Sequence, residues 1–481
     1  MSIDLNKSQI TSNRQCPKRL WLSLNRPDLL DETVNRREIE TGNNLGVIAR
    51  TLVPGGVLID AKDLQLALRQ TAQALAAKPA KPIFEAAVQH DGVRVRADLL
   101  IPQGRRWRMV EVKSSASVKD HQVEDAAIQS WVFRQAGVPL CGEGLAHINT
   151  AFVYPGGGDY DGLLIEQHQS DAVAALQSEV PQWIEAARKT MRRKRAPSIA
   201  PGAQCNKPSP CPFQSHCIAP QEGYPVQILP RGGKLVAQLQ DEGYSDLRDV
   251  PKERLSNPLH VRIWHASRTG KPYVDSALRK VLRALPYPRR YIDFETINPA
   301  IPTWPGTRPY QQIPFQWSCH IQQADGNLAH REFLADGNDD PRPAFLRTLL
   351  AATGTAGPVL VWNQSFERGR LQELAEAYPP FAGKIQKIID RMVDLLPLAR
   401  EHYYHPDMMG SWSIKAVLPT LAPDLAYEDL EVADGMQAQE AFQHILLHEI
   451  AKDQRESMRK SLLAYCERDT LAMVRVVREV S

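Results

Sequence analysis

The chain has 481 residues, of which 43% are hydrophobic and 23% charged, and its formal net charge is +3. This length exceeds what one hydrophobic core usually supports, so we expect two or three domains. The composition is typical of a globular protein, and the net charge is too small to identify a nucleic-acid-binding protein by itself.

The sequence lacks signals for membrane insertion and for a nucleotide-driven motor. Its first residues, MSIDLNKSQI, have no apolar core of a signal peptide, and no stretch approaches about 18 apolar residues. No G-x-x-x-x-G-K-[ST] sequence occurs, which excludes a P-loop. We therefore predict a cytoplasmic protein that has no membrane partner and whose seven cysteines do not form a disulfide framework.

The N-terminal part is predicted to contain helices followed by three strands and another helix. The pattern is helical from about 32 to 77, with a break at VPGG. FEAAVQHDGVRVRADLLIP (84–102) predicts a β-hairpin that turns at HDG, and WRMVEVKSS (107–115) predicts a third strand. KDHQVEDAAIQSWVFRQAG (119–137) predicts a helix that ends at Gly137.

Three polar residues of these strands form a candidate metal site. Glu111 and Lys113 share one face of a strand, and pairing with the preceding strand would bring Asp98 beside them. The carboxylates can bind Mg²⁺ or Mn²⁺, and the lysine can position a water molecule or stabilise charge on a phosphate. Gln129, on the following helix, can orient the same water or the lysine. An ordinary ion pair on an exposed strand is the alternative.

This arrangement resembles the PD-(D/E)xK nuclease superfamily, in particular its RecB-like branch with a Q-x-x-x-Y motif. Here that motif reads Gln129-x-x-x-Phe133, so the hydroxyl of the usual tyrosine is missing. The resemblance implies that Asp98 and Glu111 are metal ligands, and that these two acids act in catalysis with Lys113 and Gln129.

A second hairpin with a glycine-rich turn is predicted in HINTAFVYPGGGDYDGLLIEQ (147–167). A helix and the basic run RKTMRRKR (188–195) follow, with six cations in eight residues. Such a run is a candidate for contacts with nucleic-acid phosphates, and a solvated helix end is the alternative. The residues we expect to contact phosphates are Arg192, Arg193, Lys194 and Arg195.

Four cysteines form a candidate metal-cluster site. CNKPSPCPFQSHC contains Cys205, Cys211 and Cys217, separated by five residues each, and RQCPKRLW supplies Cys16 far upstream. Four thiolates match the ligands of a 4Fe-4S cluster, and a zinc site is the alternative. The RecB-like branch includes CRISPR adaptation nucleases and AddB-type helicase-nucleases with one cysteine before the nuclease core and three after it. The three downstream cysteines of those proteins usually have the spacing C-x2-C-x5-C, whereas this chain has C-x5-C-x5-C. The difference lies in the distance from Cys205 to Cys211.

The C-terminal part is predicted to be a second α/β region. Residues 219–285 are interrupted by prolines and predict a helical connector. YIDFET (291–296) then predicts a buried strand, and GPVLVWN (357–363) predicts another. Helices are predicted in SFERGRLQELAEAY (365–378) and in the long closing segment RESMRKSLLAYCERDTLAMVRVVREV (455–480).

Acidic residues recur in this region at informative spacings. Asp293 and Glu295 share one face of a strand, where two anions repel each other unless a cation lies between them. Tyr465 and Asp469 lie four residues apart in a helix and face the same way. With Glu367 in VWNQSFERGRL, the order D-x-E, N-x-x-F-acid and Y-x-x-x-D resembles the tyrosine subgroup of the DEDD exonucleases, which have an RNase H-like fold.

This resemblance implies a catalytic site with two divalent metal ions. One ion would activate water and the other would stabilise the leaving oxygen, while Tyr465 orients the attacking water. Asp293, Glu295 and Asp469 are the implied metal ligands. Glu367 stands where the family has an aspartate and is one methylene longer, and Asp394 is a reserve candidate.

Taken together, the motifs predict an α/β protein of two nuclease domains. We expect a restriction-endonuclease-like (PD-(D/E)xK) domain with an Fe–S cluster (1–218), a helical connector (219–285) and an RNase H-like domain (286–481). The order resembles a bacterial family that combines a RecB-like nuclease carrying a four-cysteine cluster with a DEDD-type domain.

The resemblance implies a metal-dependent nuclease, an exonuclease on single-stranded or end-containing DNA, that acts in repair or defence with a helicase or defence-system partner in trans. One alternative is a nucleic-acid-binding protein with one degenerate nuclease domain, as Phe133 and Glu367 would favour. The other is an exonuclease that acts on RNA.

Overall fold

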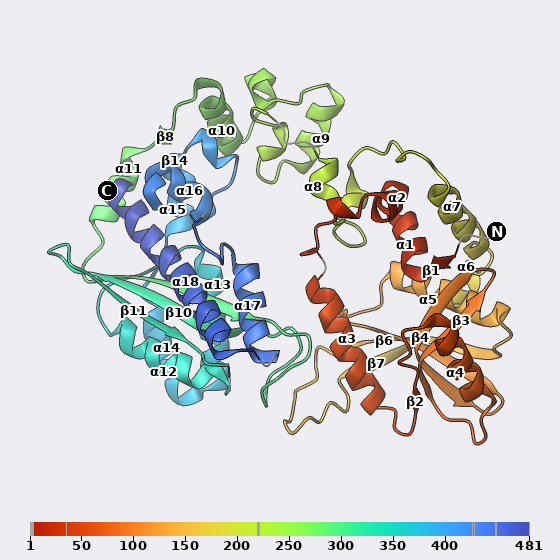
Figure 1. The fold of residues 1–481 in the computed structure, drawn as a ribbon. Coiled ribbons are helices and arrows are strands. Elements are labelled where there is room, and N and C mark those ends of the chain that lie inside the picture. The colour runs from red at the N-terminus through yellow and green to blue at the C-terminus, as the bar shows by residue number, and fades with distance from the viewer. Residues whose placement is uncertain are drawn as a thin grey trace. The chain divides into compact units, whose positions relative to one another are not determined.

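The protein has a mixed α/β fold with several sheets, organised in two compact units (Figure 1). The first unit comprises Met1–Ala219 and Pro299–Tyr310, and the second comprises Pro220–Asn298 and Gln311–Ser481. None of the described helices is both long enough and apolar enough to cross a membrane. The computed structural model describes residues 4–34, 36–218, 222–337, 339–425, 427, 429–447 and 450–480.

The first unit is built on a seven-stranded mixed sheet. Its strands follow the order β2 (Val57–Leu58), β3 (Ile83–His90), β4 (Val93–Gln103), β5 (Arg106–Lys113), β6 (Leu140–Ile148) and β7 (Leu164–His168), and β1 (Leu5–Asn6) pairs with β4. Strands β3, β4 and β5 are antiparallel, whereas β5 and β6 are parallel and are connected through α5 (Asp120–Gln135). The turn between β3 and β4 confirms the predicted hairpin, because Asp91 and Gly92 both have the positive φ that a two-residue turn favours.

Helices of the first unit pack on this sheet and on one another. They are α1 (Lys7–Gln15), α2 (Pro17–Asn25), α3 (Arg36–Thr51), α4 (Leu64–Ala76), α5, α6 (Ser170–Leu176), α7 (Val180–Met191) and α8 (Gln214–Cys217). Helix α4 packs on β3, α3 packs on β5, and α1 packs on α2 and α7. A large apolar core joins the sheet to α5 and α7.

The second hairpin of this unit differs from its prediction. Its first strand, β6, begins at Leu140 rather than near residue 147, and a long connection separates it from β7. Most of β6 is buried and shows no polar alternation, as is usual for a strand that is covered on both faces. Residues 299–310 pack on the connection, where the backbone N–H of Tyr154 donates a 3.0 Å bond to the carbonyl of Thr307 and the N–H of Gly306 donates a 2.8 Å bond to the carbonyl of Tyr154.

The second unit is built on a five-stranded sheet. Its order is β11 (Leu328–Leu334), β10 (Ile313–Gln322), β9 (Arg289–Ile297), β12 (Val359–Val361) and β13 (Met392–Asp394). Strands β9, β10 and β11 are antiparallel, and β9, β12 and β13 are parallel. The predicted strand at YIDFET therefore lies at the centre of the sheet.

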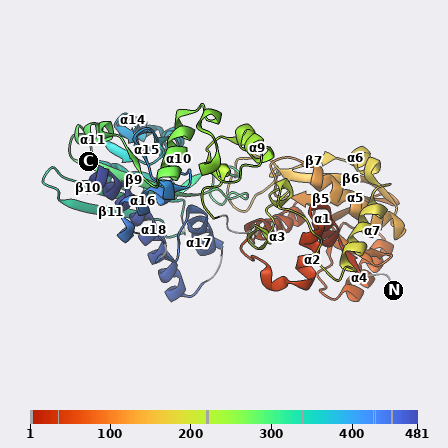
Figure 2. The same ribbon diagram turned by 90° about the horizontal axis from the view of Figure 1, so that it is seen from above.

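Two layers of helices cover this sheet (Figure 2). On one face, Ile292 and Phe294 of β9 join a core formed with α12 (Pro341–Thr353), α13 (Gln364–Ala377) and α14 (Ala382–Ile389). On the other face, α17 (Gly435–Leu447) packs on β9, and α18 (Lys452–Val480) packs on β9 and β10. The period of two along β9 thus turns Asp293 and Glu295 toward α18.

The remaining elements of the second unit include most of the predicted connector. Within residues 220–285 the structure has α9 (Gly233–Asp241), α10 (Pro258–Thr269) and α11 (Ser276–Arg283). The short strand β8 (Tyr273–Val274) pairs with β14 (Tyr403–Tyr404). The other helices are α15 (Leu395–His402) and α16 (Ile414–Leu421).

Candidate active sites

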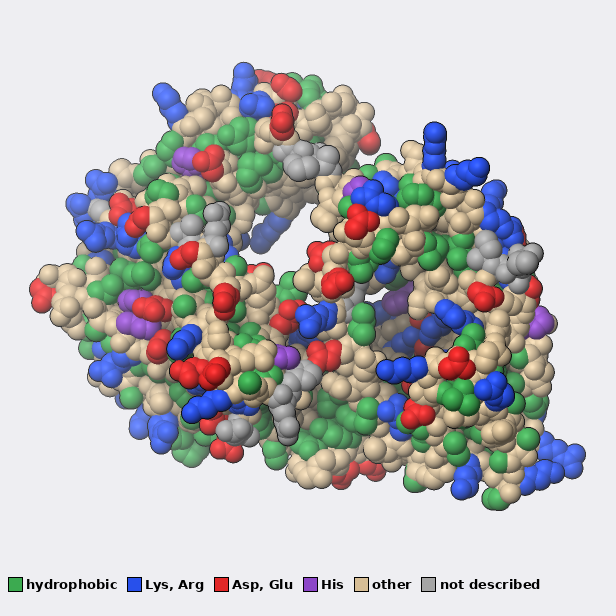
Figure 3. All heavy atoms as spheres, viewed as in Figure 1, with side chains coloured by type: hydrophobic (Ala, Val, Ile, Leu, Met, Phe, Trp, Pro, Cys, Tyr) green, Lys and Arg blue, Asp and Glu red, His purple; other side chains and the backbone are tan. Residues whose placement is uncertain are grey.

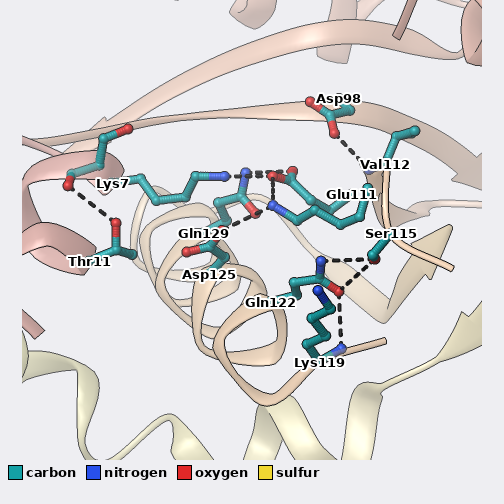
Figure 4. A network of polar contacts seen from close by, with 12 residues as sticks. Lys7, Thr11, Asp98, Glu111, Val112, Ser115, Lys119, Gln122, Asp125 and Gln129 are labelled. Atoms are coloured by element: carbon teal, nitrogen blue, oxygen red, sulfur yellow. Dashed lines mark hydrogen bonds and ion pairs between the residues drawn. The ribbon is translucent and has the colours of Figure 1, made fainter. Parts of the chain in front are cut away.

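Glu111 is the centre of a polar network in the first unit (Figure 4). Its Oε1 lies 2.5 Å from Nζ of Lys7 and 3.1 Å from Nζ of Lys113. Its Oε2 accepts a hydrogen bond of 2.7 Å from the amide of Gln129, whose own Oε1 is buried without a hydrogen-bond partner among the described residues. Glu111 itself is almost completely buried. The structure thus brings Glu111, Lys113 and Gln129 together from β5 and α5.

Asp98 lies beside this network at the end of the β4–β5 ladder. Leu99 pairs with Val110, which places Asp98 next to Glu111, and Oδ2 of Asp98 accepts a 2.7 Å bond from the backbone N–H of Val112. Desolvation and the charge of Glu111 raise the pKa of Asp98 to about 7. Desolvation would also raise the pKa of Glu111, but Lys7 and Lys113 together lower it to about 2. The two carboxylates therefore differ in charge state near neutral pH.

The structure adds residues to this site that the sequence patterns did not single out. Nζ of Lys113 lies 3.0 Å from Asp125, which precedes Gln129 by one helical turn, so an i, i+4 search of α5 would have found it. Lys7 is far away in the chain, and no local pattern points to it. Phe133, at the position of the tyrosine in the Q-x-x-x-Y motif that the sequence resembles, is fully buried in the apolar core.

Glu85 is a further acidic residue near this site. It lies on β3 between Phe84 and Ala86, which pair with Leu99 and Ala97, so it stands opposite Asp98. Its φ of 57° is unusual for a residue that is not glycine, and strain of this kind often accompanies function. Desolvation raises the pKa of Glu85, Arg50 opposes this rise, and the charge of Glu111 adds to it.

A cleft with several cations borders the network. Residues of α1, of the N-terminal part of α5 and of the segment 207–209 line it. Its cationic residues are Arg14, Arg19, Lys119 and Lys207. Arg14 is held by a 2.5 Å ion pair with Glu124. The cleft is therefore a mixed-charge surface next to Lys113 and Glu111.

In the second unit, Asp293 interacts electrostatically with three other carboxylates, which come from three elements. Asp293 and Glu295 lie on β9, Glu367 lies in the first turn of α13, and Asp469 lies on α18. Glu295, Glu367 and Asp469 are buried, and Asp293 is half-buried. Desolvation raises the pKa of each of the four, and the charge of Asp293 contributes to the rise at Glu295 and Glu367.

The donors around these carboxylates do not satisfy all of their oxygens. Tyr427 donates a 2.5 Å hydrogen bond to Oδ1 of Asp469. The positive charge of Lys415 offsets part of the rise in the pKa values of Asp293, Glu295 and Asp469. Oε2 of Glu367 is buried and has no hydrogen-bond partner in the described part of the chain. This donor set of clustered carboxylates fits hard divalent cations such as Mg²⁺ or Mn²⁺.

Aromatic and sulfur groups complete the surroundings of the acids. Nζ of Lys415 lies 4.8 Å from the ring centroid of Tyr465, and desolvation and Asp469 raise the pKa of that tyrosine. Sγ of Cys466 lies 3.9 Å from Oδ2 of Asp293, so this cysteine borders the site. Lys415 and Tyr427 have no sequence signal that we recognised.

Asp394, the reserve candidate, has a structural role. It accepts backbone hydrogen bonds of 3.1 Å from Asn363, 3.0 Å from Gln364 and 3.0 Å from Leu396. It thereby caps α15 and holds the turn that precedes α13. The same turn positions Glu367 on the first turn of α13.

The four cysteines of the predicted cluster line one pocket in the first unit. They carry free thiols, and Cys211 packs against Leu22 and Phe213. The backbone N–H of Cys211 donates a 2.8 Å bond to the carbonyl of Cys205, which folds the proline-rich loop back on itself. The structure therefore brings Cys16 to the segment that carries Cys205, Cys211 and Cys217.

The basic run divides into a structural part and an exposed part. Arg188 is buried and forms a 2.9 Å ion pair with Asp91. The run from 192 to 195 is exposed, and Figure 3 shows Lys and Arg side chains over the end of α7 and the segment that follows it. Trp21 donates a 2.9 Å bond to the carbonyl of Arg193, which fixes this segment on α2.

If the basic run contacts nucleic-acid phosphates, as the sequence predicts, neutralising its exposed part is expected to weaken DNA binding and to reduce the salt dependence of that binding. Each lost phosphate contact lowers the slope of log affinity against log salt by about 0.7–0.9. We would replace Arg192, Arg193, Lys194 and Arg195 with glutamine and measure the slope by fluorescence anisotropy. The matched control replaces the exposed Arg279, Lys280 and Arg283 of α11. If the slope of log affinity against log salt is the same in both variants and in the unaltered protein, the run is a solvated surface that does not contact phosphates.

Comparisons with known proteins match part of the chain. Residues 290–413 match a family described as "Domain of unknown function (DUF2779)". This range contains Asp293, Glu295 and Glu367 but not Asp469. Among curated relatives, Uncharacterized protein UU173 of Ureaplasma parvum serovar 3 is 28% identical over 207 residues, which is 39% of this chain and 30% of that protein.

Two mycoplasma proteins match to a similar extent. Uncharacterized protein MG366 homolog of Mycoplasma pneumoniae is 26% identical over 242 residues, 46% of this chain and 36% of the relative. Uncharacterized protein MG366 of Mycoplasma genitalium is 26% identical over 208 residues, 39% of this chain and 31% of the relative. The matched part thus spans about a third of the length of each curated relative.

Proposed function

We propose that this protein is a metal-dependent nuclease that hydrolyses phosphodiester bonds of DNA, with single-stranded or end-containing DNA as the substrate. The observation that carries the proposal is the group of four carboxylates in the second unit, from Asp293, Glu295, Glu367 and Asp469. Their mutual repulsion and the unpartnered oxygen of Glu367 call for cations. Carboxylates that hold paired divalent ions are well suited to phosphodiester hydrolysis.

Residues of the second unit would have distinct roles in this reaction. Asp293, Glu295 and Asp469 would hold divalent ions, which supply activation of water and stabilisation of the leaving oxygen. Tyr427 keeps the carboxylate of Asp469 in place through its hydrogen bond. Tyr465, one helical turn before Asp469, would orient the attacking water, in line with the DEDD resemblance.

The first unit is proposed as a second nuclease centre of the PD-(D/E)xK type. Asp98 and Glu111 would hold a divalent ion, and Lys113, held by Glu111 and Asp125, would position water or bind the scissile phosphate. Lys7 contacts one oxygen of Glu111. An ion at that oxygen would compete with Lys7, which would then be available to contact phosphate.

The topology of each unit supports the corresponding fold proposal. In the first unit, Asp98 lies on β4, Glu111 and Lys113 lie on the neighbouring β5, and Gln129 lies on the crossover helix α5, as the RecB-like resemblance requires. In the second unit, the strand with D-x-E is central, and the helix with Y-x-x-x-D packs on it, which supports an RNase H-like domain.

We also propose that Cys16, Cys205, Cys211 and Cys217 hold a 4Fe-4S cluster. The four thiols share one pocket, which supports a common ligand. A single zinc ion, which also accepts four thiolates, is the alternative.

The test of the function compares substrates and metals. We expect the purified protein to cleave single-stranded or end-containing DNA with Mg²⁺ or Mn²⁺ and to be inactive in EDTA. The same assay on duplex DNA and on RNA distinguishes the alternatives. Cleavage of RNA alone would support an RNA exonuclease, and metal-independent binding without cleavage of any substrate would contradict the nuclease proposal.

The carboxylates of the second unit are also expected to destabilise the metal-free protein. Because their pKa values are raised in the folded state, the folded protein binds more protons than the unfolded one, and stability falls as the pH rises above the usual carboxyl range. In EDTA at pH 7.5, Asp293→Asn should raise the melting temperature by at least about 2 °C, the shift that ~1 kcal/mol causes in a unit of this size. Scanning calorimetry measures this change.

Added Mn²⁺ should stabilise the unaltered protein and have less effect on Asp293→Asn, since the ion binds the folded state. Asp241→Asn, at an exposed position of α9, is the matched control and should behave like the unaltered protein. A lower melting temperature of Asp293→Asn in EDTA would mean that this carboxylate has a stabilising partner.

A further inference from the structure

A group of two histidines and a glutamate lies in the second unit, apart from the residues assigned above. His320 of β10 pairs directly with His330 of β11, and Glu467 lies above them on α18. One potential ligand atom from each of the three residues lies within 4.8 Å of the other two. Nδ1 of His330 is 3.6 Å from Oε1 of Glu467.

Hydroxyl groups orient both imidazole rings from behind. Nδ1 of His320 shares a 2.8 Å hydrogen bond with Oγ1 of Thr470, and Nε2 of His330 shares a 2.9 Å bond with Oγ of Ser318. The two hydroxyls are themselves 2.7 Å apart. These bonds leave Nε2 of His320 and Nδ1 of His330 as the ring nitrogens available to a ligand. Histidines that bind metal are usually oriented in this way through their second nitrogen.

The chemistry of the group differs from that of the carboxylate site. Two imidazoles and one carboxylate form a donor set typical of zinc, whereas four carboxylates suit magnesium or manganese. His320 is buried, and its ring stacks on that of His330 with the centroids 4.6 Å apart. Glu332 follows His330 by two residues on β11 and pairs with Ser318, so it lies on the same face of the sheet.

The group is accessible from solvent. The side chain of His330 is 22% exposed and that of Glu467 is 46% exposed, while His320 forms the buried floor. Figure 3 shows histidine and acidic side chains together on the surface over β11. An ion can therefore enter without opening the core.

We propose that His320, His330 and Glu467 form a zinc site that joins α18 to β10 and β11. Glu467 stands between Tyr465 and Asp469 on α18, so an ion held there fixes the helix that carries both residues against the sheet. The proposed zinc site does not depend on the nuclease function.

The test counts zinc in the full-length protein. Protein stripped with EDTA is incubated with zinc, freed of excess metal and measured by elemental analysis. We expect the unaltered protein to retain one zinc ion more than His330→Ala, and Glu467→Gln to lower the zinc affinity at least about 10-fold. Zinc should also raise the melting temperature of the unaltered protein and not that of His330→Ala. Zinc held at the cysteines contributes equally to all variants and cancels in the difference.

Two further variants locate the ion. His265→Ala, at an exposed position of α10, is the matched histidine control and should retain the additional zinc. Asp293→Asn should retain it as well, and its loss there would assign the ion to the carboxylate site and overturn the proposal. Equal zinc in the unaltered protein and in His330→Ala would overturn it too. Glu467→Gln alters only a surface side chain, so it decides the matter if His330→Ala does not fold.

Discussion

Lys113→Ala and Asp293→Ala are each expected to remove one of two cleavage activities and to leave the other. Asp293→Ala deletes a proposed metal ligand of the second site, where metal charge would do most of the chemistry. The rate at which the products of this site form should therefore fall at least about 100-fold. Lys113→Ala should cause a similar loss at the first site while Asp98 and Glu111 remain able to bind metal. The double variant should be inert and still bind DNA. Gel analysis of end-labelled products measures each pattern.

Matched controls use exposed residues of the same type in each unit. Lys62→Ala in the first unit and Asp241→Ala in the second should leave both patterns unchanged. If Lys113→Ala alone abolishes cleavage with every substrate and metal, the second unit is a degenerate binding module. If Asp293→Ala alone does so, the first unit has that role.

Glu367→Asp should preserve or raise the activity of the second site. It introduces the aspartate found at this position in the DEDD exonucleases that the motifs resemble. The buried Oε2 of Glu367 has no hydrogen-bond partner among the described residues, so the shorter side chain loses no hydrogen bond at that oxygen. Loss of activity in this variant would show that the site is built around the longer side chain.

Cys211→Ser is expected to remove the proposed 4Fe-4S cluster and to lower the yield of folded protein severely. Protein purified without oxygen should be brown, absorb broadly in the visible blue, and contain iron and sulfide. Cys211 is 8% exposed and packs against Leu22 and Phe213, so loss of the cluster there exposes apolar surface. Metal binding of this kind contributes directly to folding free energy.

Cys141→Ser is the control, because Cys141 lies on β6 and not in the pocket of the four cysteines. It should retain iron, colour and yield. Zinc without iron in the anaerobic protein would contradict the cluster and leave a structural zinc site. Unchanged metal content in Cys211→Ser would exclude this residue as a ligand.

Local patterns were sufficient to predict the elements that carry the candidate sites. The HDG turn, the E-x-K strand and the helix with Gln129 were predicted from short-range preferences and lie in β3–β4, β5 and α5. Alternation along β9 predicted that Asp293 and Glu295 share a face, and helical spacing predicted the same for Tyr465 and Asp469. These predictions succeeded because side-chain direction follows the backbone period of a strand or helix.

Only the tertiary structure decided what these residues meet. Lys7 reaches Glu111 across 104 positions of the chain, and Ser318 reaches Thr470 across 152. Lys415 and Tyr427 approach Asp469 from segments with no motif, and His320 meets His330 only through the register of β10 and β11. Such contacts depend on the register of paired strands and on helix packing between distant segments. Neither is encoded by a local period. The sequence by itself therefore determined which side chains share a face of one strand or helix. The tertiary structure decided which cations, hydroxyls and thiols surround them.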